Sequence, residues 1–193
     1  MHFFNTTLLA SFSIVLLLAV VPAKAENKHT PLDKHQWTFK TDPYGSEAII
    51  NKKLIRHGGI WIKFKRVPST DEKHKTWTDL IHKVPASSLV GIQKIRLTYQ
   101  TETPLLIKLP QQKYDKNGDK NYAFYQIELP ATKQWITEEV ALKDFTRPHW
   151  TPTNSTDVGL LPEHVKEIYF TPILAGNIGG EAIIQVRAIE LLP

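Results

Sequence analysis

The sequence predicts an all-β protein folded as an antiparallel β-sandwich of about nine strands. Three observations lead to this fold class. Apolar and polar residues alternate with the period of two that a half-buried strand requires, proline and glycine separate the alternating runs, and no long run has the period of an amphipathic helix. Because many short strands of this kind need a second sheet to cover their apolar faces, two packed sheets are favoured over a single layer.

Two segments show the alternation most clearly. Residues 60–65 (IWIKFK) place three apolar side chains on one face and a tryptophan with two lysines on the other. Residues 94–100 (KIRLTYQ) alternate in the same way. Further strands are expected at residues 105–109, 122–129, 136–142, 167–171 and 182–191, with weaker ones at 36–40 and 48–51.

Turn-forming residues mark the ends of these strands. They are Pro104, Pro110, the run 115–119 (DKNGD), Gly176 and the pair Gly179-Gly180. Only residues 76–83 and 162–166 can form a helical turn or two, and the chain contains no internal repeat or low-complexity tail.

The first 25 residues predict export through a cleaved signal peptide. Residues 8–21 form an apolar run, and Ala23 and Ala25 after it occupy the two positions that a signal peptidase reads. A run of about 14 residues is shorter than the ~20 that a membrane-spanning helix needs, so cleavage is favoured over an uncleaved anchor, although residues 2–7 contain no lysine or arginine. We therefore expect one domain, residues 26–193, that is secreted or periplasmic and has no membrane span after cleavage.

The composition excludes several kinds of site. The 193 residues include no cysteine, so disulfides, thiolate sites and a lipid-anchored N-terminal cysteine are all excluded. The formal net charge is +5, and it falls to +4 when Lys24 leaves with the signal peptide. A charge this small over a whole domain does not predict a nucleic-acid partner.

Basic residues concentrate between positions 52 and 75. They are Lys52, Lys53, Arg56, Lys63, Lys65, Arg66, Lys73 and Lys75, opposed only by Asp71 and Glu72. One interpretation is a solvated edge whose lysines discourage strand pairing between molecules. The other is a surface for an acidic partner such as a uronic-acid polysaccharide, a lipid head group or an acidic protein. The sequence leaves both interpretations open.

Several short motifs follow one another in a familiar order. They are PASSLVGI (85–92) leading into IRLTY (95–99), YAFYQIELP (122–130), Trp135, DFTRPHW (144–150), IYF (168–170) and IQVRAI (184–189). Over residues 89–191 this order resembles that of galactose-binding-like jelly rolls, in particular family 11 carbohydrate-binding modules and the domain of complex I intermediate-associated proteins. The resemblance implies a non-catalytic module that holds sugar on a concave sheet face or at loop tips, in some cases with a structural calcium ion.

The acidic residues do not support a calcium site, and no cofactor is expected. Asp33, Asp42 and Glu190 lie near the termini, where such a site would be, but no run of oxygen ligands surrounds them. The run 115–119 lacks the ligand spacing and the distant bidentate glutamate of an EF-hand, so it is interpreted as a hairpin turn.

Strand parity identifies a candidate sugar-binding surface of aromatic and hydrogen-bonding side chains. A pyranose stacks its C–H face on an aromatic ring, and its hydroxyls need a few fixed polar partners. The alternative is that these residues are ordinary cross-strand pairs on a wetted sheet, since aromatic residues stabilise strands wherever they lie. The candidate ligand-binding residues are Trp61, Lys63, Arg96, Tyr122, Phe124, Gln126, Trp150, Tyr169 and Arg187.

The tryptophans receive different assignments. Trp61 shares its face with lysines, so we expect it to face solvent or lie under a loop. Trp150 is either a sugar contact or a plug at one end of the sandwich, and Trp77 can face either way. Trp37 and Trp135 are assigned to the core.

Catalysis finds little support in the sequence. The chain has no Gly-x-Ser-x-Gly elbow, no His-Glu-x-x-His and no glycine-rich phosphate loop. Its histidines lack metal-ligand spacing, and most of them are expected at the surface. A pair of carboxylates that meet only in space would leave no sequence mark.

The sequence therefore favours an exported, non-catalytic carbohydrate-binding protein, with acidic polysaccharide among its possible ligands. The main alternative is an envelope or adhesion scaffold that docks another protein through its basic segment, and the third is a sandwich-fold polysaccharide lyase or hydrolase. Sugar binding predicts Trp61, Tyr122 or Tyr169 exposed in a groove, and docking predicts a flat apolar patch with a charged rim. An enzyme predicts two carboxylates, or a tyrosine and a histidine, converging in a cleft.

Overall fold

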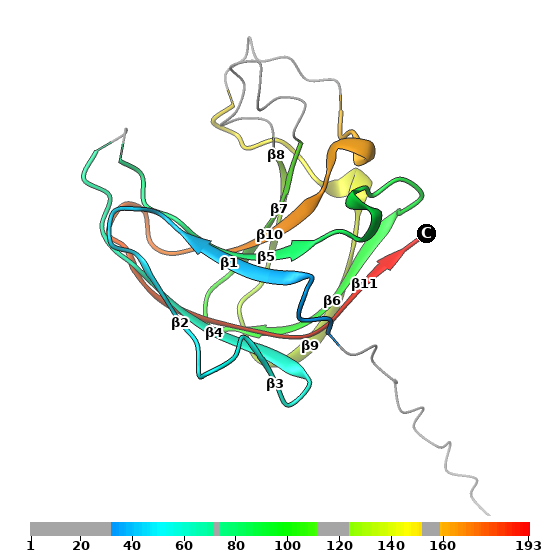
Figure 1. The fold of residues 1–193 in the computed structure, drawn as a ribbon. Coiled ribbons are helices and arrows are strands. Elements are labelled where there is room, and N and C mark those ends of the chain that lie inside the picture. The colour runs from blue at the N-terminus through cyan, green and yellow to red at the C-terminus, as the bar shows by residue number, and fades with distance from the viewer. Residues whose placement is uncertain (1–31, 72–73, 112–123, 152–158) are drawn as a thin grey trace, which may run out of the picture.

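The protein consists of two antiparallel β-sheets packed face to face, as a computed structural model shows for residues 32–71, 74–111, 124–151 and 159–193 (Figure 1). The five-stranded sheet has the order β1 (Trp37–Thr41), β5 (Thr78–Lys83), β10 (Glu167–Pro172), β7 (Leu105–Pro110) and β8 (Phe124–Leu129). The six-stranded sheet has the order β2 (Glu47–Ile49), β4 (Gly59–Arg66), β11 (Gly180–Leu192), β6 (Lys94–Thr101) and β9 (Thr132–Ala141), with β3 (Ile55–Arg56) paired to β4. The predicted all-β sandwich is confirmed.

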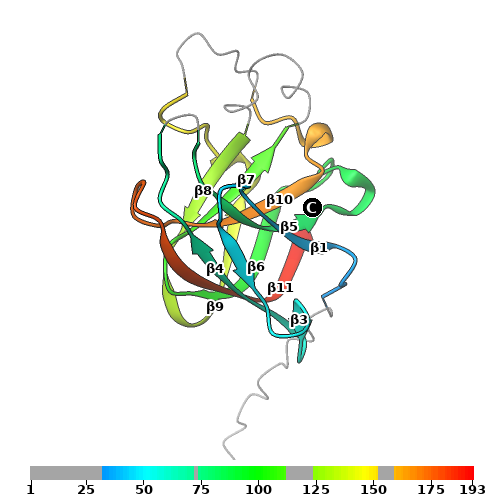
Figure 2. The same cartoon turned by 60° about the vertical axis from the view of Figure 1, so that its left-hand side comes forward.

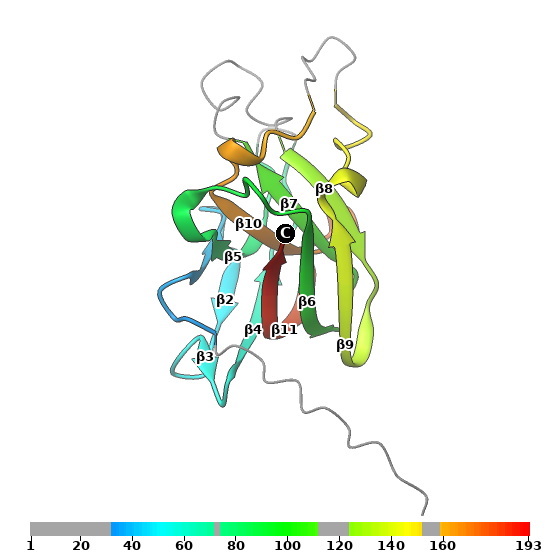
Figure 3. The ribbon, with the colours of Figure 1, turned by 90° about the vertical axis from the view of Figure 1, so that its right-hand side faces the viewer.

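Short 3₁₀ turns connect some of these strands. They are η1 (Pro85–Ser87), η2 (Leu142–Asp144) and η3 (Pro162–His164). Figure 3 shows β11 between β4 and β6 in the six-stranded sheet. Figure 2 shows β3 at the lower end of the sandwich, where it extends the six-stranded sheet beside β4. The predicted signal peptide, residues 1–25, lies outside the described residues.

The core lies between the sheets and is filled by every second residue of the strands. Phe64 on β4, Tyr99 on β6 and Phe170 on β10 are fully buried. Tyr99 keeps its hydroxyl paired by donating to the carbonyl of Pro130 at 2.9 Å, and burial raises the pKa of this tyrosine to about 12. The residues that the alternation assigned to the inner faces of β4 and β6 are thus the ones that lie in the core.

Strand β5 corrects one prediction. Residues 76–83 were expected to allow a helical turn, but Thr78–Lys83 is a strand that pairs with β1 on one side and β10 on the other. Five of its six residues are buried, so both of its faces are covered. A strand covered on both faces has no apolar–polar alternation, and periodicity therefore cannot identify it.

Two of the tryptophan assignments have different outcomes. Trp37 belongs to the core, as predicted, and is 5% exposed. Trp135 does not: it is only half-buried, and the guanidinium of Arg187 lies 4.2 Å from its ring centroid. The core assignment was wrong because the strand β9 begins at Thr132, four residues before the expected start, so that Trp135 shares the outward side of this strand with Thr137.

His82 is an exception to the expectation that most of the histidines lie at the surface. It is 2% exposed, and its ring centroid lies 4.7 Å from that of Trp37. Burial lowers the pKa of His82 from 6.5 to about 4, because the charged imidazolium would lose its hydration inside the core.

We expect the folded protein to lose stability as the pH falls from about 6.5 to about 4, because the unfolded chain protonates His82 in this range and the folded chain does not. The contribution at the lower end is about 3 kcal/mol. Urea unfolding at a series of pH values measures it. The variant His82→Leu should have a shallower pH dependence over this range, whereas His35→Leu, at an exposed position, should behave like the parent protein. Parallel curves for the parent and His82→Leu would contradict this account.

A matched pair of glycines tests the close packing of the loop before β11. Both Gly91 and Gly179 have a φ of +82°, so an alanine costs about 1–2 kcal/mol of backbone strain at either position. At Gly179 an added Cβ would also lie 2.4 Å from the carbonyl oxygen of Arg66, whereas at Gly91 nothing lies within 4 Å.

Gly179→Ala should therefore destabilise the fold by about 3 kcal/mol or more, clearly beyond the effect of Gly91→Ala. Chemical unfolding of the two variants measures the difference. Equal losses of stability would mean that the backbone of residues 66–68 moves aside without cost.

Candidate functional site

The candidate ligand-binding residues lie on two faces that point away from each other. Phe124, Gln126 and Tyr169 are on the outer face of the five-stranded sheet, since they alternate with core residues of β8 and β10. The residues Trp61, Lys63, Arg96 and Arg187 are on the outer face of the six-stranded sheet. Tyr122 lies outside the described residues. A single small ligand cannot contact both groups.

Lys108 is the centre of the outer face of the five-stranded sheet. Its Cα pairs across the strands with those of Tyr169 and Gln126. The Nζ atom lies 5.6 Å from the ring centroid of Tyr169 and 5.8 Å from that of Phe124. The sequence analysis did not select Lys108, although it is the outward-facing polar residue of the expected strand 105–109.

Asp79 holds this lysine in place. The Nζ atom of Lys108 lies 2.9 Å from Oδ1 of Asp79, and the two side chains are only 16% and 6% exposed. The hydroxyl of Thr171 donates to the same carboxylate oxygen. The ion pair is therefore sheltered from water, although it is on an outer face of the sandwich.

Trp150 reaches this surface from the segment that follows η2. Two backbone hydrogen bonds between Gln126 and Thr146, of 2.8 and 3.0 Å, attach the segment to strand β8. Phe145 anchors it in the core. The ring of Trp150 packs edge-on against Phe124 with centroids 5.8 Å apart, and 48% of the residue remains exposed. An indole with this exposure does not plug the end of the sandwich.

Tyr169 is oriented by a hydrogen bond within its own strand. Its hydroxyl donates to Oε2 of Glu167 at 2.9 Å, and both residues are on the outer face of β10. Lys83 on β5 is the cross-strand partner of Glu167. The aromatic rings on this face are therefore accompanied by acidic and basic groups in nearly equal number.

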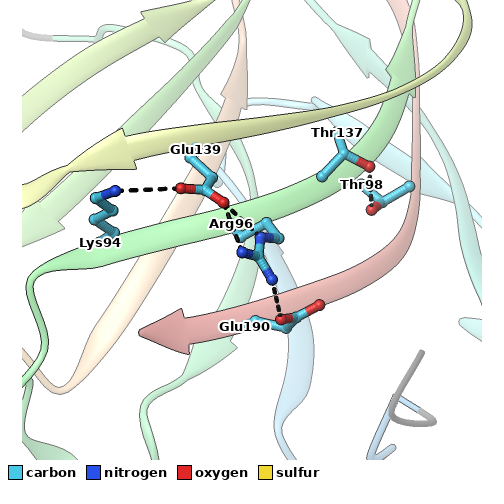
Figure 4. A network of polar contacts seen from close by, with 6 residues as sticks. All are labelled: Lys94, Arg96, Thr98, Thr137, Glu139 and Glu190. Carbon is cyan, nitrogen blue, oxygen red and sulfur yellow. Dashed lines mark hydrogen bonds and ion pairs between the residues drawn. The ribbon is translucent and has the colours of Figure 1, made fainter. Parts of the chain in front are cut away.

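Arg96 is engaged in a network on the opposite sheet (Figure 4). Its guanidinium bonds Oε1 of Glu139 at 2.6 and 2.8 Å and Oε2 of Glu190 at 2.7 Å. Lys94 contacts the same Glu139 at 3.4 Å. The hydrogen bond from Arg96 lowers the pKa of Glu139. Because both sides of the guanidinium are occupied by carboxylates, Arg96 links β9, β6 and β11 and has little capacity left for a ligand.

The remaining residues on this sheet form contacts of two kinds. Lys63 pairs with Glu181 at 2.6 Å, and this carboxylate offsets part of the positive charge of the basic segment 52–75. The guanidinium of Arg56 lies 5.7 Å from the ring centroid of Trp61. Trp61 is half-buried beneath this arginine, which agrees with its predicted place among basic groups.

A separate cavity of about 640 Å³ lies where β6 begins and β9 ends. Its lining is mainly apolar and includes Ile92, Tyr125, Leu142, Phe145 and Leu160. No candidate ligand-binding residue lines it, so the sequence-based site and this cavity are distinct.

The described residues were also searched for metal-binding clusters and for membrane-spanning helices. Within them, no cluster of three or more histidine, aspartate or glutamate side chains has the geometry to hold a metal ion. The possible calcium ligand Asp42 instead accepts backbone N–H groups from Tyr44 and Trp77 at 2.7 and 2.8 Å, and these bonds help to lower its pKa against the opposing effect of desolvation. The run 115–119 is outside the described part of the chain. No helix in that part is long and apolar enough to span a membrane.

The sheltered ion pair can be tested by mutation. Lys108→Met leaves the carboxylate of Asp79 buried without its cation and should destabilise the fold by about 3 kcal/mol. Lys63→Met removes a pair whose side chains are much more exposed and should cost less than about 1 kcal/mol. The double variant Asp79→Asn/Lys108→Met should lose less than the two single losses combined, as a urea-unfolding cycle would measure. Equal effects of Lys108→Met and Lys63→Met would show that the sheltered pair contributes no more than a surface pair.

No protein-family profile matches this sequence, and no curated protein matches it significantly. Solved structures do match its fold. The family 11 carbohydrate-binding module of the cellulosomal cellulase Lic26A-Cel5E of Clostridium thermocellum has 13% identity and a TM-score of 0.51, over 83% of this chain and 94% of that one. A family 11 module from the same organism, in complex with a β-1,3-1,4-mixed-linked tetrasaccharide, has 14% identity and a TM-score of 0.50, over 84% and 96%.

The solution structure of CtCBM11 has 15% identity and a TM-score of 0.53, and covers 87% of this chain and 97% of that one. At this identity the similarity concerns the fold alone. It extends further toward the N-terminus than the motifs at residues 89–191, because the shared feature is the arrangement of strands. The predicted resemblance to a carbohydrate-binding-module sandwich is thus confirmed at the level of the fold.

Proposed function

We propose that this protein is an exported, non-catalytic carbohydrate-binding protein that holds a neutral oligosaccharide on the outer face of the five-stranded sheet. One observation carries the proposal. The rings of Phe124, Trp150 and Tyr169 share this face with the sheltered Lys108–Asp79 pair. Residues from β5, β7, β8, β10 and the segment after η2 together form this surface.

The chemistry of a sugar matches these groups. The aromatic rings supply faces and edges for the C–H surface of a pyranose, while the ion pair and Gln126 supply donors and acceptors for its hydroxyls. Cross-strand contacts already hold Lys108, and a hydrogen bond holds Tyr169. Little side-chain entropy would therefore be lost when a sugar binds.

The charge balance favours a neutral ligand on this face. Lys108 is neutralised by Asp79, and Glu167 lies opposite Lys83. A neutral sugar would not have to displace either carboxylate. The family 11 module whose complex contains a β-1,3-1,4-mixed-linked tetrasaccharide has the same kind of sandwich, so a mixed-linked glucan is the first ligand to test.

The two alternatives have less support. Docking through the basic segment has less support because Lys63, one of its cations, is already paired with Glu181. Catalysis by paired carboxylates requires two acids in one cleft. On the proposed face the buried acid Asp79 is instead paired with a lysine.

Trp150→Ala should lower the affinity for a mixed-linked glucan tetrasaccharide about tenfold or more, because it removes the most exposed ring among the described residues of this face. Isothermal titration calorimetry measures the dissociation constant. Trp61→Ala is the matched control, since it removes an indole from the opposite sheet and should bind like the parent protein. Loss of binding in Trp61→Ala alone would move the site to the other sheet. No binding across a panel of neutral glycans would refute the proposal.

A further inference from the structure

The outer face of the six-stranded sheet contains a groove of about 440 Å³. Its lining residues are Gln100, Thr101, Glu102, Thr132, Lys133, Ile183 and Gln185. All of these residues except Ile183 have polar side chains, and they include one acid and one base. It lies on the opposite side of the sandwich from Lys108 and Trp150, so it is independent of the glycan site proposed above.

Two glutamines form the floor of this face, with an indole on either side. Gln185 pairs with Trp61 across β4 and with Gln100 across β6. Gln100 donates from Nε2 to the carbonyl of Lys133 at 2.7 Å, and the pairing of β6 with β9 brings Trp135 beside it. The row Trp61–Gln185–Gln100–Trp135 crosses four neighbouring strands, a distance of about 14 Å.

Each indole carries a guanidinium group. The Cζ atom of Arg56 lies 5.7 Å from the ring centroid of Trp61, and that of Arg187 lies 4.2 Å from the ring centroid of Trp135. Within the described part of the chain neither arginine forms an ion pair with a carboxylate, in contrast to Arg96. A cation–π contact uses none of the N–H donors of a guanidinium, so each arginine can still bind a carboxylate through two of them.

The two arginines are neighbours on the sheet. Arg56 pairs with Gly59, and the pairing of Ile60 with Val186 places Arg187 on the other side of the same glycine. Their guanidinium groups, however, lie by Trp61 and Trp135, at the two ends of the row described above, which is about 14 Å long. A ligand that contacts both of them must therefore be an oligomer with carboxylates spaced along it.

We infer that the outer face of the six-stranded sheet is a second binding site, specific for an anionic oligosaccharide built of uronic-acid units. Its carboxylates pair with Arg56 and Arg187, and its sugar rings lie along the Trp61–Gln185–Gln100–Trp135 row. The amides of the two glutamines bind hydroxyls, and the indoles provide apolar surface for the rings. The hollow shape and the amide floor favour a saccharide over a flat protein partner.

The test uses a tetramer of galacturonic acid and, as its neutral counterpart, a tetramer of galactose, each titrated by calorimetry at low salt. Arg56→Gln and Arg187→Gln should each weaken galacturonate binding about tenfold, and the neutral tetramer should bind far more weakly than the acidic one. Raising the salt concentration should weaken galacturonate binding further. Lys143→Gln removes an exposed charge elsewhere and should bind like the parent protein.

Two further variants separate this site from the glycan site on the other sheet. Trp150→Ala should leave galacturonate binding unchanged, and Trp135→Phe should retain more of it than Trp135→Ala because phenylalanine still supports Arg187. Thermal unfolding verifies that each variant is folded.

The inference fails if galacturonate does not bind, if both arginine variants bind it like the parent, or if the neutral tetramer binds equally well. It also fails if Trp150→Ala, and neither arginine variant, abolishes galacturonate binding, since that result would place the acidic sugar on the five-stranded sheet. None of these results depends on whether the mixed-linked glucan binds.

Discussion

The packing of two sheets through alternate side chains is the constraint on which the rest of this structure depends. Phe64, Tyr99 and Phe170 fill the space between the sheets and are fully buried. Because a strand directs successive side chains to opposite sides, filling the core with one set of residues forces the other set outward. The sandwich therefore has two outer faces, and their side chains are determined by the same strands that build the core.

The two outer faces differ in whether their cations are paired with carboxylates. On the five-stranded sheet, Lys108 is held by the sheltered carboxylate of Asp79, so the aromatic surface around it is close to neutral. On the six-stranded sheet, Arg56 and Arg187 lie near indoles, and neither forms an ion pair with a carboxylate of the described residues. A neutral sugar suits the first arrangement and an acidic sugar the second, because an ion already paired must be separated from its partner before it can bind another.

Much of the fold was predictable because its strands have one polar face. The alternation in residues 60–65 and 94–100 identified β4 and β6 and the direction of their core residues. Strand β5 was missed because it is buried on both faces, and Trp135 was misplaced because β9 begins earlier than the pattern indicated. His82 is buried beside Trp37, a position that its residue type does not reveal.

The sequence by itself determined the fold class, the absence of cysteine chemistry and the outward direction of residues such as Trp61 and Tyr169, since each follows from composition or from a period of two. The tertiary structure decided which of those residues share a surface. Strand order brings β10 next to β7 and β11 next to β6, far apart along the chain, and so joins Tyr169 to Lys108 while Glu139 and Glu190 occupy Arg96. Cross-strand partners depend on pairing and register, and neither is encoded in the local pattern of a single strand.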